Sequence, residues 1–151
     1  MNFMQVSNVS RPYRFFKEVP PGERGQMEHR LAEHGFVDKI RIRFAAGENG
    51  TLRVRPVIII NPGIIIDIFK YPVGGDKWLT GDFETIEESL NYEIEANARL
   101  VVFYENTATD PETTNSQVNV NIGVTYYQKV EPENVIGPRS PGFFRGLANG
   151  W

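Results

Sequence analysis

Residues 36–60, FVDKIRIRFAAGENGTLRVRPVIII, carry the clearest β pattern of the chain. On either side of the central AAGENG segment, apolar side chains alternate with charged ones, and this period of two is typical of a strand. We therefore predict strands over residues 36–44 and 51–60. The Asn49-Gly50 pair favours a turn with positive φ, so we predict that the two strands form a hairpin at the centre of the core. Its inward face is predicted to contain Phe36, Ile40, Ile42, Phe44, Leu52, Val54, Ile58 and Ile60.

Five cations occupy the opposite face of the same predicted hairpin. Like charges on neighbouring strands destabilise a sheet, so opposite charges must offset them. Carboxylates of the same domain would make this a solvated, neutralised face, whereas carboxylates of another subunit would make it an inter-subunit salt-bridge surface. A phosphate or nucleic-acid surface is the third hypothesis, although no aromatic residues are interleaved with the cations. This predicted basic face consists of Lys39, Arg41, Arg43, Arg53 and Arg55.

Further β-patterned runs flank this centre, separated by Gly, Pro, Asn and Asp turns. Two of them have a helical alternative: the MEHRLAEH segment has helical composition, and Ile86, Leu90 and Ile94 recur at a spacing of four. We predict a strand in both cases, over residues 26–31 and from about Ser89 onward. The other predicted strands are 11–19 at a sheet edge, 64–71 as a buried strand, and 99–104 and 117–130 as a pair joined by the polar loop 108–116.

Seven or eight strands without a long helix predict an all-β fold, a two-sheet antiparallel β-sandwich that is jelly-roll-like and has extended N- and C-terminal arms. The predicted parts are an N-terminal arm (1–11), a β-sandwich domain (12–130) and a C-terminal interaction arm (131–151). Prolines and glycines oppose regular structure in the last part, while its apolar side chains favour docking. The alternative is that this arm packs on its own domain. The predicted partner-binding residues are Arg139, Phe143, Phe144, Arg145, Leu147 and Trp151.

Composition argues against several classes of function. The 151-residue chain has a net charge of −3, which disfavours nucleic acid as a partner. Its longest apolar run, residues 57–69, is interrupted and shorter than the ~20 residues that span a bilayer, so we expect no membrane partner. The chain has no cysteine and only His29 and His34 as histidines, so we expect no metal and no cofactor. Nucleophile and phosphate-binding motifs are also missing from the sequence, so we predict a non-enzymatic protein without catalytic residues.

Aromatic residues support an alternative function. Sandwich-type carbohydrate-binding modules stack sugars on flat exposed rings, and the pattern places Trp78, Tyr71 and Tyr127 at turns or on outward faces. Packing of these rings against the ends of the sandwich or against another subunit competes with sugar binding. We therefore keep a carbohydrate-binding β-sandwich module as the alternative hypothesis.

Three stretches carry a resemblance to known proteins: residues 19–58 (VPPGERGQMEHRLAEHGFVDKIRIRFAAGENGTLRVRPVI), 93–107 (EIEANARLVVFYENT) and 118–130 (VNVNIGVTYYQKV). Their pattern resembles small β-sandwich proteins of tailed-phage virions, either auxiliary or decoration proteins of the capsid or fibre and tail modules. The resemblance implies a structural role in a bacteriophage virion, with assembly in the host cytoplasm. The implied partners are further copies of the chain, other virion proteins such as the major capsid protein, or both. It assigns no site residue, and similar features also occur in bacterial sugar-binding sandwiches.

Overall fold

The computed structural model describes residues 5–45, 50–69, 77–110 and 115–130. These residues form β-strands and their connections, and no helix among them is long and apolar enough to cross a membrane. The strands are β1 (Gln5–Val19), β2 (Arg24–Arg30), β3 (Gly35–Phe44), β4 (Leu52–Ile60), β5 (Ile64–Asp67), β6 (Leu79–Thr80), β7 (Glu84–Ile94), β8 (Arg99–Asn106) and β9 (Ser116–Val130).

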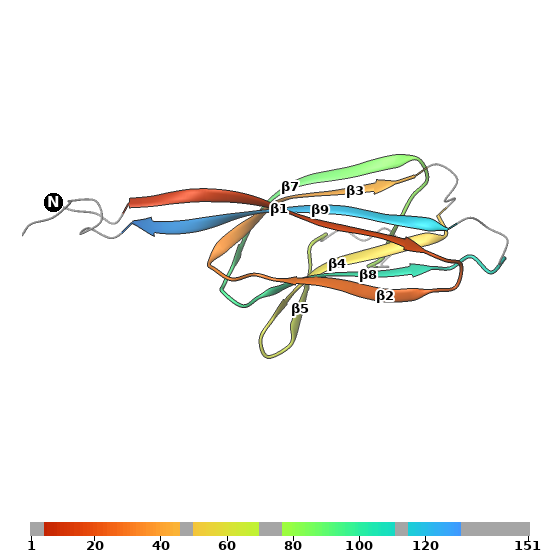
Figure 1. The fold of residues 1–151 in the computed structure, drawn as a ribbon, viewed down its shortest axis with the longest axis horizontal. Coiled ribbons are helices and arrows are strands. Elements are labelled where there is room, and N and C mark those ends of the chain that lie inside the picture. Colours follow the sequence, from red (N-terminus) through yellow and green to blue (C-terminus); the bar gives the residue numbers. More distant parts are fainter. Residues whose placement is uncertain (1–4, 46–49, 70–76, 111–114, 131–151) are drawn as a thin grey trace, which may run out of the picture. The chain divides into compact units, whose positions relative to one another are not determined.

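The strands form two antiparallel sheets that pack as a sandwich (Figure 1). Sheet A has the strand order β1-β9-β3-β7, and sheet B has the order β2-β8-β4-β5, with β6 also paired to β4. Strands β1 to β4 alternate between the two sheets, and the last strand lies beside the first, which is the arrangement of a jelly roll. The predicted all-β, jelly-roll-like sandwich is therefore confirmed.

The chain divides into two compact units. Residues 10–126 form the unit that contains the sandwich, and the described residues of the other unit are the ends of β1 and β9, residues 5–9 and 127–130. Because β1 begins at Gln5, strand structure covers part of the predicted N-terminal arm, residues 1–11. The predicted C-terminal arm, residues 131–151, lies outside the described residues.

Both predicted pairings between strands that follow one another in the sequence are wrong. β3 belongs to sheet A and β4 to sheet B, so residues 36–60 do not form a hairpin, and β8 and β9 also lie in different sheets. Alternation fixes which side chains point to the core. It does not fix whether the next strand stays in the same sheet, because both sheets of a sandwich turn their apolar faces to the same core.

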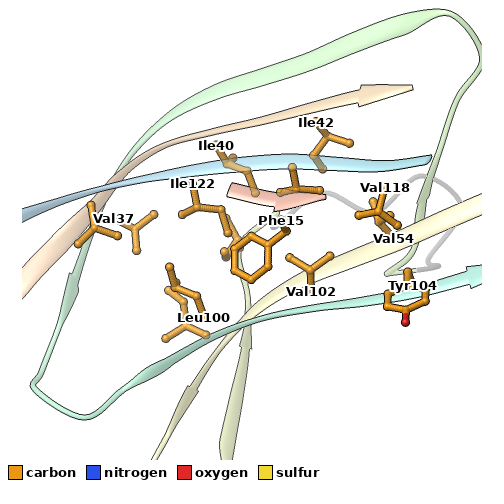
Figure 2. Close-up of a cluster of buried hydrophobic side chains, with 14 of the residues drawn as sticks. Phe15, Val37, Ile40, Ile42, Val54, Leu100, Val102, Tyr104, Val118 and Ile122 are labelled. Atoms are coloured by element: carbon orange, nitrogen blue, oxygen red, sulfur yellow. The ribbon is translucent and has the colours of Figure 1, made fainter. Parts of the chain in front are cut away.

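The hydrophobic core lies between the two sheets (Figure 2). Phe15 of β1 is 1% exposed, and Figure 2 shows its ring pointing into the space between the sheets. Burying each large apolar side chain contributes about 1.5–3 kcal/mol before the loss of chain entropy is subtracted. Sheet A contributes Val37, Ile40 and Ile42 of β3 and Val118, Val120, Ile122 and Val124 of β9, while sheet B contributes Leu52, Val54 and Ile58 of β4 and Leu100 and Val102 of β8.

A β-bulge in β3 changes its predicted inward face. The register of β3 with both neighbouring strands shifts between Val37 and Lys39, and Val37 takes the core place that the alternation predicts for Phe36. Asp38 lies at the shift, and its carboxylate accepts a hydrogen bond from the Thr125 hydroxyl of β9. This polar contact favours the bulge over a regular alternation.

Both segments with a helical alternative form strands. β2 pairs with β8, and β7 pairs with β3 and starts at Glu84, before the predicted Ser89. β5 ends at Asp67, earlier than the predicted residue 71. It is also less buried than predicted, because it is the last strand on its side of sheet B.

Candidate functional site

Sheet B ends in an isoleucine-rich hairpin. β4 and β5 pair up to Ile60↔Ile64, and the Asn61-Pro62-Gly63 turn joins them. Ile64 is 57% exposed and Ile65 is 48% exposed. In the described part of the chain β5 pairs only with β4, and Figure 1 shows this hairpin extending away from the other strands. An edge strand presents unpaired backbone N–H and C=O groups, so this apolar edge is suited to contact with another polypeptide.

The same hairpin continues an apolar cluster on the outer face of sheet B. Ile65 lies directly opposite Ile59 in the β4–β5 register. Ile59 belongs to a cluster with Val57 and Val101, against which Phe103 packs. The exposed edge of the hairpin is therefore continuous with buried apolar side chains of the same sheet.

Arg53 and Arg55, on the outer face of sheet B, have carboxylate partners within the chain. Arg53 Nη2 lies 2.7 Å from Glu105 Oε1, and Arg55 Nε lies 2.7 Å from Asp67 Oδ1. The Arg53 guanidinium also lies 4.6 Å from the centroid of the Trp78 ring. For these two members of the predicted basic face, neighbouring carboxylates offset the charge, as the neutralised-face hypothesis predicts.

Arg55 and Asp67 form a bidentate ion pair. Arg55 Nε donates to Oδ1 at 2.7 Å and Nη2 donates to Oδ2 at 3.1 Å. The hydrogen bond from Arg55 lowers the pKa of Asp67 below its ordinary value of 3.8, against an opposing effect of burial. Lys77 Nζ, at 3.6 Å from Oδ2, lowers this pKa further. Because the side chains are mostly buried, this pair is expected to stabilise the fold more than an exposed pair does.

Asp67→Asn is expected to lower the free energy of unfolding by about 1–2 kcal/mol at pH 7. The pKa of Asp67 is lower in the folded chain than in the unfolded one, so its stabilising effect is complete above the unfolded value of 3.8. It is lost as the pH falls through the folded value, so the difference between wild type and variant should shrink below pH 3.8. Urea unfolding between pH 7 and pH 3 measures this. The matched control is Glu28→Gln, which removes the more exposed Arg99–Glu28 pair. Equal, pH-independent losses in both variants would contradict the assignment.

The cations of β3 do not join those of β4 in one face. Lys39, Arg41 and Arg43 are exposed on the outer face of sheet A, whereas Arg53 and Arg55 belong to sheet B. None of the three cations of β3 takes part in an ion pair among the described residues. The predicted basic face is therefore two separate surfaces, of which only the one on sheet B is balanced internally.

A hollow of about 290 Å³ lies on this outer face of sheet A. Arg41 and Arg43 line it together with Arg14 of β1 and with Asn119 and Asn121 of β9. Asn121 lies directly opposite Arg41 in the β3–β9 register. Arg14 and the two asparagines were not predicted as site residues. The two asparagines alternate with the apolar residues of β9, but no signal in the sequence indicates that β1 and β9 lie on the same side of β3. We call these five residues the arginine hollow.

A second cavity, of about 80 Å³, lies between β5 and β7 and is lined mainly by apolar residues such as Ile58 and Leu90. Ligand sites usually have volumes of about 300–1,000 Å³, so this cavity is a packing gap rather than a ligand site. Among the described residues, no group of three or more His, Cys, Asp or Glu side chains is placed to hold a metal ion.

Of the residues of the sugar-binding alternative, the structure describes Trp78 and Tyr127. Trp78 is half-buried, and the Arg53 guanidinium occupies one face of its ring. Tyr127 is half-buried in β9, and Tyr71 lies outside the described residues. The predicted partner-binding residues Arg139, Phe143, Phe144, Arg145, Leu147 and Trp151 also lie outside the described residues.

No protein-family model and no curated protein matches the chain. Among solved structures, a chain of infectious bursal disease virus, Gx strain, overlaps at a TM-score of 0.44 with 10% identity, covering 88% of this chain and 34% of that one. The VP2 subviral particle of the same virus gives a TM-score of 0.29 with 10% identity, covering 85% and 38%. The T13 particle gives 0.31 with 14% identity, covering 93% and 44%. The chain spans less than half the length of each match, and similarities at these TM-scores carry no argument about function.

Proposed function

We propose that the chain is a non-enzymatic structural protein of a virion, in particular an auxiliary or decoration capsid protein or related head or tail component of a bacteriophage, that docks onto neighbouring subunits. The jelly-roll fold is compatible with this role, since such sandwiches occur in viral capsid domains and in lectins. A fold alone does not define a function. The virion setting is supported by the resemblance of residues 19–130 to tailed-phage sandwich proteins.

The observation that carries the docking role is the exposed hairpin of β4 and β5. Ile64 and Ile65 expose about half of their surface, next to the apolar cluster around Ile59. Exposed isoleucines on an edge strand favour association, and an isolated soluble domain usually protects such an edge with charges or proline. The terminal arms are proposed as a second means of docking, with Phe143, Phe144 and Trp151 inserting into apolar pockets of neighbours.

The test is self-association of the full chain by sedimentation velocity over a range of concentrations. We expect the wild type to form larger species as concentration rises. The double variant Ile64→Lys with Ile65→Lys should remain a monomer over the same range, because the two charges oppose burial of the hairpin and protect its edge. Both positions are exposed, so its free energy of unfolding should stay within about 0.5 kcal/mol of the wild type.

The matched control adds two lysines elsewhere, at the exposed residues Gln26 and Ala32. This control variant has the same net charge as the hairpin variant and should associate like the wild type. A wild type that stays monomeric at every concentration, or two variants that dissociate equally, would show that the hairpin is not a docking surface. Association that survives in the hairpin variant and disappears in Phe143→Ser with Phe144→Ser would assign docking to the C-terminal arm instead.

A further inference from the structure

We propose that the arginine hollow of sheet A is a binding site for an acidic polypeptide segment, whose carboxylates pair with Arg14, Arg41 and Arg43. The hollow lies on the other sheet from the β4–β5 hairpin. This site is a second surface, separate from the proposed docking hairpin, and binding to it does not depend on docking through the hairpin. Its partner is recognised by its negative charge.

The arginines of β3 differ in charge balance from those of the central strands β4 and β8 of sheet B. On sheet B, Arg53, Arg55 and Arg99 each lie within 3.4 Å of a carboxylate oxygen. On sheet A, Arg41 and Arg43 form no ion pair with a described residue, and Glu87, opposite Arg41 in the β3–β7 register, is not within ion-pair distance of it. Three guanidinium groups around one hollow repel one another, and a bound anion would relieve this repulsion.

The hollow presents hydrogen-bond donors that suit carboxylates. A guanidinium is planar and matches the two oxygens of a carboxylate with parallel N–H donors. The Arg14 guanidinium lies 4.9 Å from the centroid of the half-exposed Phe16 ring, which restrains it while its in-plane N–H groups remain able to donate. Asn119 and Asn121 add amide groups that both donate and accept, and these can bind the backbone of an extended peptide.

The charges around the hollow favour an acidic peptide over nucleic acid. The basic patch is bordered by the edge strand β7, on which Glu87 lies opposite Arg41. A polynucleotide carries a phosphate at every step and depends on an extended cationic path, which this glutamate interrupts. A hollow of about 290 Å³ instead fits a few side chains. The charge pattern therefore favours a short segment with two or three carboxylates.

The test is a binding titration of the full chain with fluorescein-labelled hexaglutamate, followed by fluorescence anisotropy at low salt. We expect saturable binding that weakens as salt is added, because the contacts are exposed ion pairs. The variant Arg14→Gln, Arg41→Gln and Arg43→Gln should bind at least about tenfold more weakly. The single variant Arg41→Gln should lower the affinity for hexaglutamate by a smaller factor than the triple variant does. If the triple variant does not fold, the affinity of the single variant is measured instead.

The matched control replaces the exposed Arg11, Arg24 and Arg30 with glutamine and so changes the net charge by the same amount. It should bind hexaglutamate within about twofold of the wild type, because these residues do not line the hollow. Labelled hexaglutamine should not bind to any of the proteins. An equal loss in both triple variants, or no binding by the wild type, would overturn the proposal. Tighter binding of a hexathymidylate through the same three arginines would overturn it in favour of nucleic acid.

Discussion

Gly35→Ala is expected to destabilise the protein by at least about 3 kcal/mol and to reduce the yield of folded chain sharply. Gly35 opens β3 and lies opposite Tyr126 in the β3–β9 register. A Cβ atom at this position would lie 2.3 Å from the Thr125 carbonyl oxygen and 3.0 Å from Tyr126 Cα. Both of these are backbone atoms of the adjacent strand, so the clash cannot be relieved by a side-chain rotation. β3 and β9 would have to separate at this point of sheet A.

The matched control for this prediction is Gly123→Ala in the neighbouring strand β9. There the added Cβ would lie 2.6 Å from Asp38 Oδ1, which is the end of a side chain. The Asp38 side chain can rotate away, which breaks its hydrogen bond with Thr125. We therefore expect Gly123→Ala to lower the free energy of unfolding by about 1 kcal/mol. Urea unfolding of both variants compares the two. If Gly35→Ala costs no more than Gly123→Ala, the close backbone approach at Gly35 is not a constraint on the fold.

Phe15→Ala is expected to lower the free energy of unfolding by about 3–5 kcal/mol. Phe15 is 1% exposed, and its ring packs in the central layer between the sheets (Figure 2). Its ring also lies 5.0 Å from the His29 ring of β2, in an edge-on arrangement. Truncation leaves a cavity bordered by both sheets, and β1 has few means of closing it because it is held in place by β9. Urea unfolding with a free fit of the slope measures the loss.

The adjacent residue provides the control for this second prediction. Phe16 is 47% exposed and points to the other face of β1, where the Arg14 guanidinium lies over its ring. Phe16→Ala removes the same group of atoms from the same strand, and it should lower the free energy of unfolding by no more than about 1 kcal/mol. Similar losses at the two positions would contradict the placement of Phe15 in the core, since only one of the two rings is buried.

The strands and their inward faces were largely predictable from the sequence, because the period of two is a local property of the chain. In residues 117–130, for example, Val118, Val120, Ile122 and Val124 alternate with polar residues or glycine, and all four lie in the core. The pairing of the strands was not predictable in this way. Asn49-Gly50 indicated a turn, but whether the chain turns back within its sheet or crosses to the other depends on contacts with strands far away in the sequence.

The candidate sites were less predictable than the strands. The isoleucines of residues 64–66 indicated a buried strand, and the exposure of Ile64 and Ile65 follows only from the position of β5 at a sheet edge. Arg41 and Arg43 were recognised as part of a basic face, but their true neighbours, Arg14 and Asn121, come from the two ends of the domain. The bulge at Asp38 could not be predicted from the sequence either, because it depends on a hydrogen bond with Thr125 in a later strand.

β9 lies between β1 and β3 in sheet A and is synthesised after both of them. The hydroxyls of Ser10 and Thr125 lie 3.3 Å apart although 115 residues separate them along the chain. At a synthesis rate of about 5–20 residues per second, the ribosome needs roughly 6–23 s to cover that distance. During this time the nascent β1 and β3 expose edges that only β9 can occupy. Sheet A therefore completes its pairing only after β9 has been synthesised, and until then the edges of β1 and β3 are open to strand pairing with other chains.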